Sequence, residues 1–469
     1  MSIRVAAAAV AALAAALAGC ALKSPPPVAD LQQQALPHTA VPPAFKAAGG
    51  ATAPVAERWL ASFNDQALSA LVDEALNYNA DLQAAALRVE RADGYLKVAG
   101  ASLLPQVGAY GTGSGATSNS TSGLNGLWVN ASLELDIWGR VRYGQAAAQA
   151  DAEALAADYA YARQSLAAMV AKSWFLATEA GLQRAIVQDM VRTSESLLGL
   201  AQDRLRVGNG TQQDVAAARA NVGPYRDLLR QADLSREQAL RALELLLGRY
   251  PSAELTVAQN LSPMPAPVPV GLPSELLERR PDVVAAERRV AAAFNRVGEA
   301  QAARLPRISL TAGISTISSD VIVLQDRDNP AWGLGINLLA PIYQGGALRA
   351  QVEVRTTEQK LAVAAYASAG QRAFGEVENA LAAEFALGDR EAILQANVRD
   401  NEQALELTKT QFRVGSTDLR AVEQRQLALH SARKSLLRVQ SERLAQRVNL
   451  HLALGGNFGD TTAWPVAAR

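Results

Sequence analysis

The chain has 469 residues, with 45 basic and 45 acidic side chains, and 49% of its residues are hydrophobic. The balanced charge argues against nucleic-acid binding, which requires a basic surface. The three histidines are far apart in sequence and form no metal-binding pattern. Beyond the leader, no run of 18 or more apolar residues predicts a transmembrane helix. We therefore expect no nucleic-acid partner, no metal and no organic cofactor.

The N-terminus is predicted to be a signal peptide over residues 1–19. Residues 5–17 form an apolar stretch that is too short to cross a bilayer as a helix. The sequence Leu-Ala-Gly-Cys that ends at Cys20 resembles the lipobox of bacterial lipoproteins, which implies cleavage before Cys20 and acylation of its thiol. Ala21 implies, by the same resemblance, the outer membrane. The alternative is an ordinary secretory signal followed by a chance cysteine. Cys20 is the sole cysteine, so no disulfide can form within the chain.

After the leader, the chain contains two copies of one unit. Asp81 and Asp282 are 201 positions apart, and Gly208 and Gly415 are 207 apart, with matching landmarks between them in the same order. Such self-similarity is the mark of an internal duplication. The predicted organisation is a lipidated segment and belt at 20–67, a first repeat at 68–249, a proline-rich connector at 250–272, a second repeat at 273–456 and a tail at 457–469.

Each repeat is predicted to contain a helix, two strands, a long helix, a turn and a returning helix. Alternation of apolar and polar residues predicts strands at about 105–115, 127–138, 306–318 and 331–343. Strands of this length with one apolar face are typical of a membrane barrel, and the alternative is a soluble two-faced sheet. Four strands cannot close a barrel, and lipid does not tolerate an open sheet edge. We therefore predict a barrel that is shared between chains.

The long helices are predicted at about 141–207 and 347–414, and neither contains a proline. At 1.5 Å per residue each is roughly 100 Å long. A returning helix covers about half of each long helix, and the helix before the strands can cover much of the rest. The alanine-rich composition predicts close neighbours on both sides, whereas a solitary coiled coil, the alternative, would show a single Leu/Ile seam.

The sequence Arg-Val-Gly ends both long helices, as Arg206, Val207 and Gly208 and again as Arg413, Val414 and Gly415. Glycine suits the positive φ of a helix C-cap, and arginine in the last turn suits the helix dipole. This structural role is compatible with a second one. Exposed turns at the tips of long helices are natural docking points.

Three features of the sequence resemble the TolC-like outer-membrane efflux proteins, and in particular their NodT-like lipoprotein branch. They are the two glycine turns, the stretch ELDIWGRVR and the stretch GLPSELLERRPDVVAAERRVAAAFNRVGEAQAARLPRISL (271–310). The resemblance covers nearly all of the mature chain. It implies a mainly α fold with a membrane β-barrel, formed by a homotrimer with twelve strands, a long α-helical periplasmic tunnel and an equatorial belt. It also implies a lipid-anchored exit duct in the outer membrane. By the same resemblance, a periplasmic adaptor contacts both turns and joins the duct to an inner-membrane pump of the resistance-nodulation-division class.

The same family closes its periplasmic end with charged residues just past the second turn. The matching candidates for this gate are Asp418, Arg420, Glu423 and Arg425, with Asp214 from the first repeat and Phe412 beside the turn. The alternative is that the charges are ordinary solvated helix residues and that Phe412 only packs the tip.

The favoured function is passive conduction of drugs and toxic small molecules out of the cell. We find no metalloprotease, P-loop or nucleophile-elbow motif, so we expect no enzyme and no catalytic residue. Three alternatives remain: a duct for metal ions or for a secreted polypeptide, a structural envelope lipoprotein, and an envelope enzyme on a helical scaffold.

Overall fold

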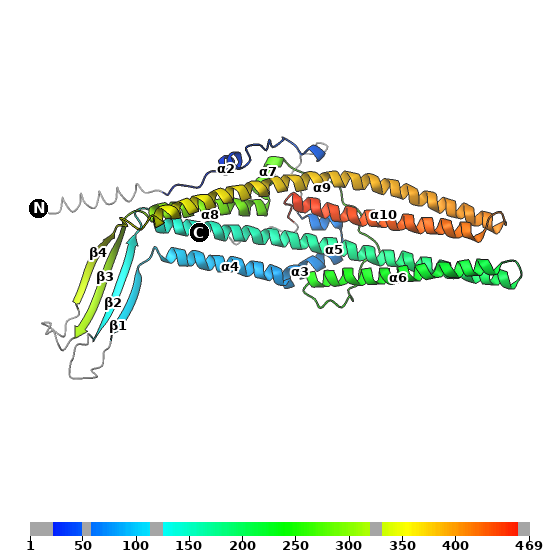
Figure 1. The fold of residues 1–469 in the computed structure, drawn as a ribbon, viewed down its shortest axis with the longest axis horizontal. Helices are drawn as coiled ribbons and strands as arrows, with labels where there is room; N and C mark the ends of the chain where they lie inside the picture. The colour runs from blue at the N-terminus through cyan, green and yellow to red at the C-terminus, as the bar shows by residue number, and fades with distance from the viewer. Residues whose placement is uncertain (1–21, 49–57, 113–124, 319–330, 458–469) are drawn as a thin grey trace. The chain divides into compact units, whose positions relative to one another are not determined.

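The computed structural model describes residues 22–48, 58–112, 125–318 and 331–457 (Figure 1). Most of these residues are helical, and the strands form one sheet. Among the described residues, no helix is both long and apolar enough to span a bilayer. The predicted lipid site Cys20 and nearly all of the predicted tail lie outside the described residues. The short elements are α2 (Val28–Ala35), η1 (Lys46–Ala48), η2 (Trp59–Phe63), α3 (Gln66–Tyr78) and α7 (Pro273–Arg279).

The two sequence repeats fold into helices of equal length. The pairs are α4 (Ala80–Ala101) and α8 (Pro281–Ala302) with 22 residues each, α5 (Arg140–Arg206) and α9 (Ala347–Arg413) with 67 each, and α6 (Gln212–Leu246) and α10 (Leu419–Ala453) with 35 each. The long helices thus end one residue before the predicted limits. Each repeat places its strands between the first helix and the long helix (Figure 1).

The four strands form an antiparallel sheet in the order β1-β2-β3-β4. They are β1 (Gln106–Thr112), β2 (Asn125–Leu135), β3 (Arg307–Ser318) and β4 (Ala331–Leu339). The central pairing of β2 with β3 joins the two repeats, and β1 and β4 are the edge strands.

The register places apolar side chains on one face of the sheet. Leu310 lies opposite Leu133 on one side and opposite Ile336 on the other, whereas the next residue, Thr311, lies opposite Ser132 and Gly335. Directly opposite residues of an antiparallel pair share a face. Ile336 is 73% exposed, so the apolar face remains uncovered at β4. The alternation in the sequence therefore predicted the two faces as the structure has them.

Two predicted strands are too long at their C-terminal ends. The strand predicted to 138 ends at Leu135, because the carboxylate of Asp136 turns back to accept hydrogen bonds from the backbone N–H groups of Val141 and Arg142, both at 2.9 Å. Gly139 completes this turn with a φ of 75°. The strand predicted to 343 ends at Leu339, because the following Pro341 has no N–H for the ladder.

The compact units of the structure do not coincide with the two repeats. One unit takes Leu87–Asp158, Asp282–Ala369 and the described residues up to Thr39, and the other takes Ala40–Ala86, Tyr159–Pro281 and the described residues from Gly370 onward. Each unit therefore contains parts of both repeats. The predicted division at 250–272 follows the duplication in the sequence but not the packing of the chain.

The second unit has an aromatic and aliphatic core. Trp59 is 2% exposed and stacks on His451 with a ring separation of 5.5 Å, and Phe63 lies 5.3 Å from Phe175. The carboxylate of Asp65 caps α3 and also accepts the indole N–H of Trp174 at 2.9 Å. The segment before α3 is thus fixed firmly against the long helix α5.

Candidate functional site

The turn between α5 and α6 is a helix C-cap closed by glycine. Gly208 has a φ of 77°, the N–H of Asn209 donates to the carbonyl of Arg204 at 2.8 Å, and the N–H of Gly208 donates to that of Leu205 at 3.1 Å. This pair of bonds is the Schellman motif. The turn between α9 and α10 repeats it, with a φ of 78° at Gly415. The glycines of both predicted turns therefore have the backbone conformation that the sequence required.

The arginine and valine of each turn face solvent. Val207 is 66% exposed and Val414 is 75% exposed, although both are apolar. The guanidinium of Arg206 pairs with the exposed carboxylate of Asp203 at 2.7 Å, and that of Arg413 contacts the hydroxyl of Thr410 at 3.4 Å. Each turn thus presents one apolar and one cationic side chain on a rigid backbone.

Two of the predicted gate residues cap the returning helices. Asp214 forms a capping box with Thr211, in which the Thr211 hydroxyl accepts from the Asp214 N–H at 3.1 Å and the Asp214 carboxylate accepts from the Thr211 N–H at 3.1 Å. Asp418 is the N-cap of α10 and accepts from the N–H of Ala421 at 2.9 Å. The bonds from Thr211 hold the pKa of Asp214 below its usual value, with smaller help from Arg420 and Arg204.

Three contacts join the two helical hairpins near their turns. The side-chain amide of Asn221 donates to the carboxylate of Glu423 at 3.0 Å, and the guanidinium of Arg420 lies 3.9 Å from the carboxylate of Asp214. The guanidinium of Arg204 lies 5.5 Å from the ring centre of Phe412. Each contact connects the first hairpin to the second, so the two turns are held together.

A cavity of about 160 Å³ lies between these contacts. Four of the six predicted gate residues line it, namely Asp214, Asp418, Arg420 and Glu423. Phe412 instead packs against the buried cluster of Leu405, Val422 and Leu429. Arg425 is exposed and does not line this cavity. The structure therefore brings together the predicted charges of both repeats, except Arg425.

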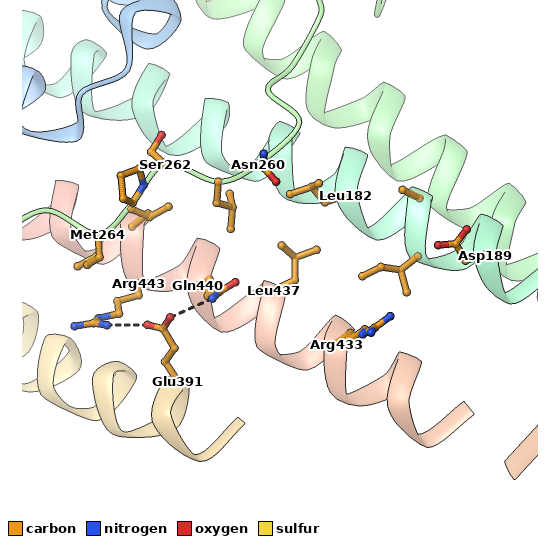
Figure 2. A pocket seen from close by; sticks show the side chains of 15 residues that line it. Leu182, Asp189, Asn260, Ser262, Met264, Glu391, Arg433, Leu437, Gln440 and Arg443 are labelled. Atoms are coloured by element: carbon orange, nitrogen blue, oxygen red, sulfur yellow. Dashed lines mark hydrogen bonds and ion pairs between the residues drawn. The ribbon is translucent and has the colours of Figure 1, made fainter. Parts of the chain in front are cut away.

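A larger cavity of about 620 Å³ lies farther along the same unit (Figure 2). It is bounded by α5, α10 and the connector around Ser262, and Glu391 of α9 lies at its edge. The carboxylate of Glu391 pairs with Arg443 at 2.7 Å and accepts from the amide of Gln440 at 3.2 Å. These charges neutralise each other, and no ligand chemistry follows from them.

Two of the sequence motifs make contacts between segments that are distant in the chain. In ELDIWGRVR, the indole N–H of Trp138 donates to the carbonyl of Pro306 at 2.8 Å, which ties the first repeat to the second at the end of the sheet. In LLERRPD, Arg280 is 1% exposed, pairs with Glu376 at 2.7 Å and donates to the carbonyl of Ala453 at 3.2 Å. The burial of Arg280 depends on packing, and the sequence itself shows only that Arg280 precedes Pro281, the first residue of α8.

In the part of the chain that the structure describes, no three His, Cys, Asp or Glu residues are grouped so that they could hold a metal ion. The charged residues at the turns are engaged in caps and pairs.

Comparison with known proteins shows the family to which this chain belongs. The family model described as "Outer membrane efflux protein" matches residues 71–249 and 272–456. The cation efflux system protein CusC of Escherichia coli O6:H1 is 30% identical over 460 residues, which cover 95% of this chain and 97% of that protein. The pyoverdine export outer membrane protein OpmQ of Pseudomonas putida is 31% identical over 421 residues, which cover 86% and 88%. The crystal structure of the MtrE outer membrane channel of Neisseria gonorrhoeae in its open state matches with a TM-score of 0.79 at 27% identity and covers 93% of this chain and 98% of that one.

Proposed function

The chain belongs to the outer membrane efflux protein family, as an outer-membrane exit duct of a tripartite efflux pump, and from this premise we propose how its parts divide the work. The observation that supports the proposal most directly is the pair of matching turns. Each turn closes a helix of 67 residues and presents an exposed valine and an arginine. We propose that a periplasmic adaptor docks on Arg206 to Gly208 and on Arg413 to Gly415, and so connects the duct to an inner-membrane pump.

We propose that three copies assemble into one duct. The described part of each chain supplies four strands, and the edge strands β1 and β4 have backbone groups with no partner within this sheet. Such groups are costly in hydrocarbon, so copies would have to pair edge to edge until the sheet closes. Three copies give twelve strands whose apolar face, with Leu334 80% exposed in the single chain, would meet lipid.

We propose that the contacts between the hairpins restrain the periplasmic end of the duct. The residues that we propose for this restraint are Asp214, Phe412, Asp418, Arg420 and Glu423. Arg425 is an exposed charge near them. The supporting observation is that Asp214, Phe412, Arg420 and Glu423 each contact a residue of the other hairpin. Asp418 caps its own helix and lines the cavity between the hairpins. Acylation of Cys20 as the anchor in the outer membrane is a further part of the proposal.

We propose small molecules such as drugs and toxic compounds as the cargo. Relatives of nearly equal similarity are named for different cargoes, a cation for CusC and pyoverdine for OpmQ. The described residues of this chain contain no cluster that would favour a metal ion. Export of metal ions is the second candidate, because of the name of CusC, and export of a polypeptide has no observation in its favour.

The docking role of the turns can be tested in cells that depend on this channel. We expect the variant V207D/V414D to lose resistance to pump substrates, because charges replace the exposed apolar contacts, while its amount in the outer membrane stays unchanged. The matched control is Y250D, since Tyr250 is 85% exposed in the connector. Full resistance with V207D/V414D would overturn the assignment of the turns.

A further inference from the structure

The first described residues of the chain contact the region where β2 turns into α5. The backbone N–H of Lys23 donates to the phenol oxygen of Tyr143 at 2.9 Å, although the two residues are 120 positions apart. The side chain of Leu22 lies on Gly139, where an added Cβ would come within 2.6 Å of the Leu22 Cδ2. Two consecutive residues are thus held at this place, one by its backbone and one by its apolar side chain.

Two glycines provide the space for these contacts. Gly139 has a φ of 75° and lies under Leu22, so both its backbone and its surroundings exclude a side chain. Gly298 of α8 leaves room for the ring of Tyr143, because a Cβ there would lie 2.7 Å from the Cδ1 and Cε1 atoms of that ring. Glycine inside a helix is less stable than alanine. Gly298 therefore indicates that the position of the Tyr143 ring, and with it the hydroxyl that accepts from Lys23, has a use.

The second repeat has the same glycine before its long helix but lacks the rest of this arrangement. Its glycine, Gly346, has a φ of 84°, and an added Cβ would meet no packing neighbour within 4 Å among the described residues. Ala350 stands 207 positions after Tyr143, and Lys97 stands 201 positions before Gly298. The connection of a strand to a long helix therefore does not require the tyrosine or the second glycine. These residues occur only in the copy that the N-terminal segment contacts.

We propose that Gly139, Tyr143 and Gly298 form a docking site for the mature N-terminus, which holds the acylated end of the chain beside the end of β2. This inference rests on the proposed acylation of Cys20 and names the part of the fold to which the anchor is attached. Ala21 alone separates Cys20 from Leu22, and two residues of extended chain span at most about 7 Å. Docking of Leu22 therefore also restricts where the lipid-bearing thiol can reach.

The docking site is built on a turn that is itself fixed to the sheet. The carboxylate of Asp136 accepts from the backbone N–H groups of Val141 and Arg142, both at 2.9 Å. The indole N–H of Trp138 donates to the carbonyl of Pro306, next to the first residue of β3, at 2.8 Å. A docked N-terminus therefore moves together with the strands. An undocked one would act as a tether of several residues before α2, which would leave the anchor free to move relative to the sheet.

The rate of tryptic cleavage after Lys23 tests the docking site in the full chain extracted with detergent. The cut between Lys23 and Ser24 requires the segment to leave its site, so its rate follows the fraction of undocked chains. Mass spectrometry of the released peptide, residues 20–23, gives both this rate and the acylation state of Cys20. We expect Y143F to release the peptide about fivefold faster than the parent, which is the effect of one lost hydrogen bond. Y250F is the control and should match the parent, because Tyr250 is 85% exposed.

A pair of glycine variants separates docking from backbone strain. G139A and G346A both place a methyl group at a positive φ, of 75° and 84°, but only G139A directs it at Leu22. We expect G139A to speed the release at least fivefold and G346A to leave it within about twofold of the parent. L22A should speed the release as well, and L22A/G139A should add little to either change, because both remove the same contact.

The two parts of the inference fail in different ways. Release from the parent as fast as from Y143F and G139A, or equal effects of G139A and G346A, would overturn the docking site even if Cys20 carries lipid. Slow release of a peptide without acyl chains would retain the docking site but overturn the proposed acylation, and with it the role of the site in anchoring.

Discussion

The side-chain amide of Asn221 on α6 donates a hydrogen bond of 3.0 Å to the carboxylate of Glu423 on α10, which joins residues that are 202 positions apart in the sequence. The bond connects the two hairpins close to their turns. It is therefore one of the interactions that must break if the hairpins separate.

We predict that E423A raises the ion conductance of the channel in planar bilayers. A hydrogen bond of this kind contributes about 1 kcal/mol, so the closed state should lose roughly a factor of five in population. N221A should act similarly, and the double variant should add little, because both changes remove the same bond. E423Q is the control, since its amide oxygen still accepts. Unchanged conductance in E423A would make Glu423 an ordinary solvated charge.

Arg280 is predicted to be a main determinant of the stability of its unit. R280A would remove the pair with Glu376 and leave the carbonyl of Ala453 without this donor. Since Glu376 is 44% exposed and can be hydrated, we expect a loss of about 2 kcal/mol, below the cost of stranding a fully buried charge. The adjacent R279A is the control, because its pair with Glu275 is long, at 3.8 Å, and partly exposed. Thermal unfolding in detergent should separate the two variants, and equal midpoints would contradict the prediction.

Gly208 and Gly415 are predicted to tolerate no β-branched residue. Both have φ near +78°, where a side chain costs about 1–2 kcal/mol per residue. We expect G208V/G415V to distort the turns and reduce adaptor binding, measured by co-purification, while the outer-membrane level of the protein persists. The control is G199A, because Gly199 is inside α5 with no atom within 4 Å of an added Cβ. This control should bind the adaptor as the parent does, and normal binding by G208V/G415V would refute the role of the turn geometry.

His451 is predicted to make the second unit sensitive to acid. Burial against Trp59, and to a lesser extent the charge of Arg447, lowers the pKa of His451 to about 3. The unfolded chain takes up this proton near pH 6.5, whereas the folded chain does not. Stability is therefore full above pH 6.5 and falls by up to about 1.4 kcal/mol per pH unit as the pH drops toward 3.

H451F keeps the ring stacking and removes the titration. Its unfolding midpoint should fall less than that of the parent between pH 6.5 and pH 5. H38Q is the control, because His38 is exposed. If the parent and H451F lost stability in parallel over this range, His451 would not be the source of the acid sensitivity.

Much of this fold could be predicted from local patterns, because strands and capped helices depend on neighbouring residues. Alternation around Leu310 indicated the apolar face, and the Arg-Val-Gly sequence indicated the end of α5. The roles of Asp214 and Asp418 in capping could also be predicted from the sequence, because Asp418 immediately precedes a helix and Asp214 lies in the first turn of one.

Features that depend on packing between distant segments could not be predicted. Asn221 was not among the predicted residues, because only the contact between hairpins gives it a role. The compact units were missed for a related reason. Each long helix begins in one unit and continues into the other, so the duplication in the sequence does not mark the boundaries of packing.

Corresponding helices of the two hairpins have equal lengths, with 67 residues in α5 and α9 and 35 in α6 and α10. This equality restricts where the chain can gain or lose residues. Deleting seven residues from both arms of one hairpin would withdraw its turn by about 10 Å along the helix axis. Asn221 would then lose its hydrogen bond to Glu423, and the contacts between the hairpins near the two turns would no longer meet. A matched deletion in all four arms would preserve these relations. Insertions and deletions in the hairpin arms should therefore be inherited together in all four arms, two in each repeat.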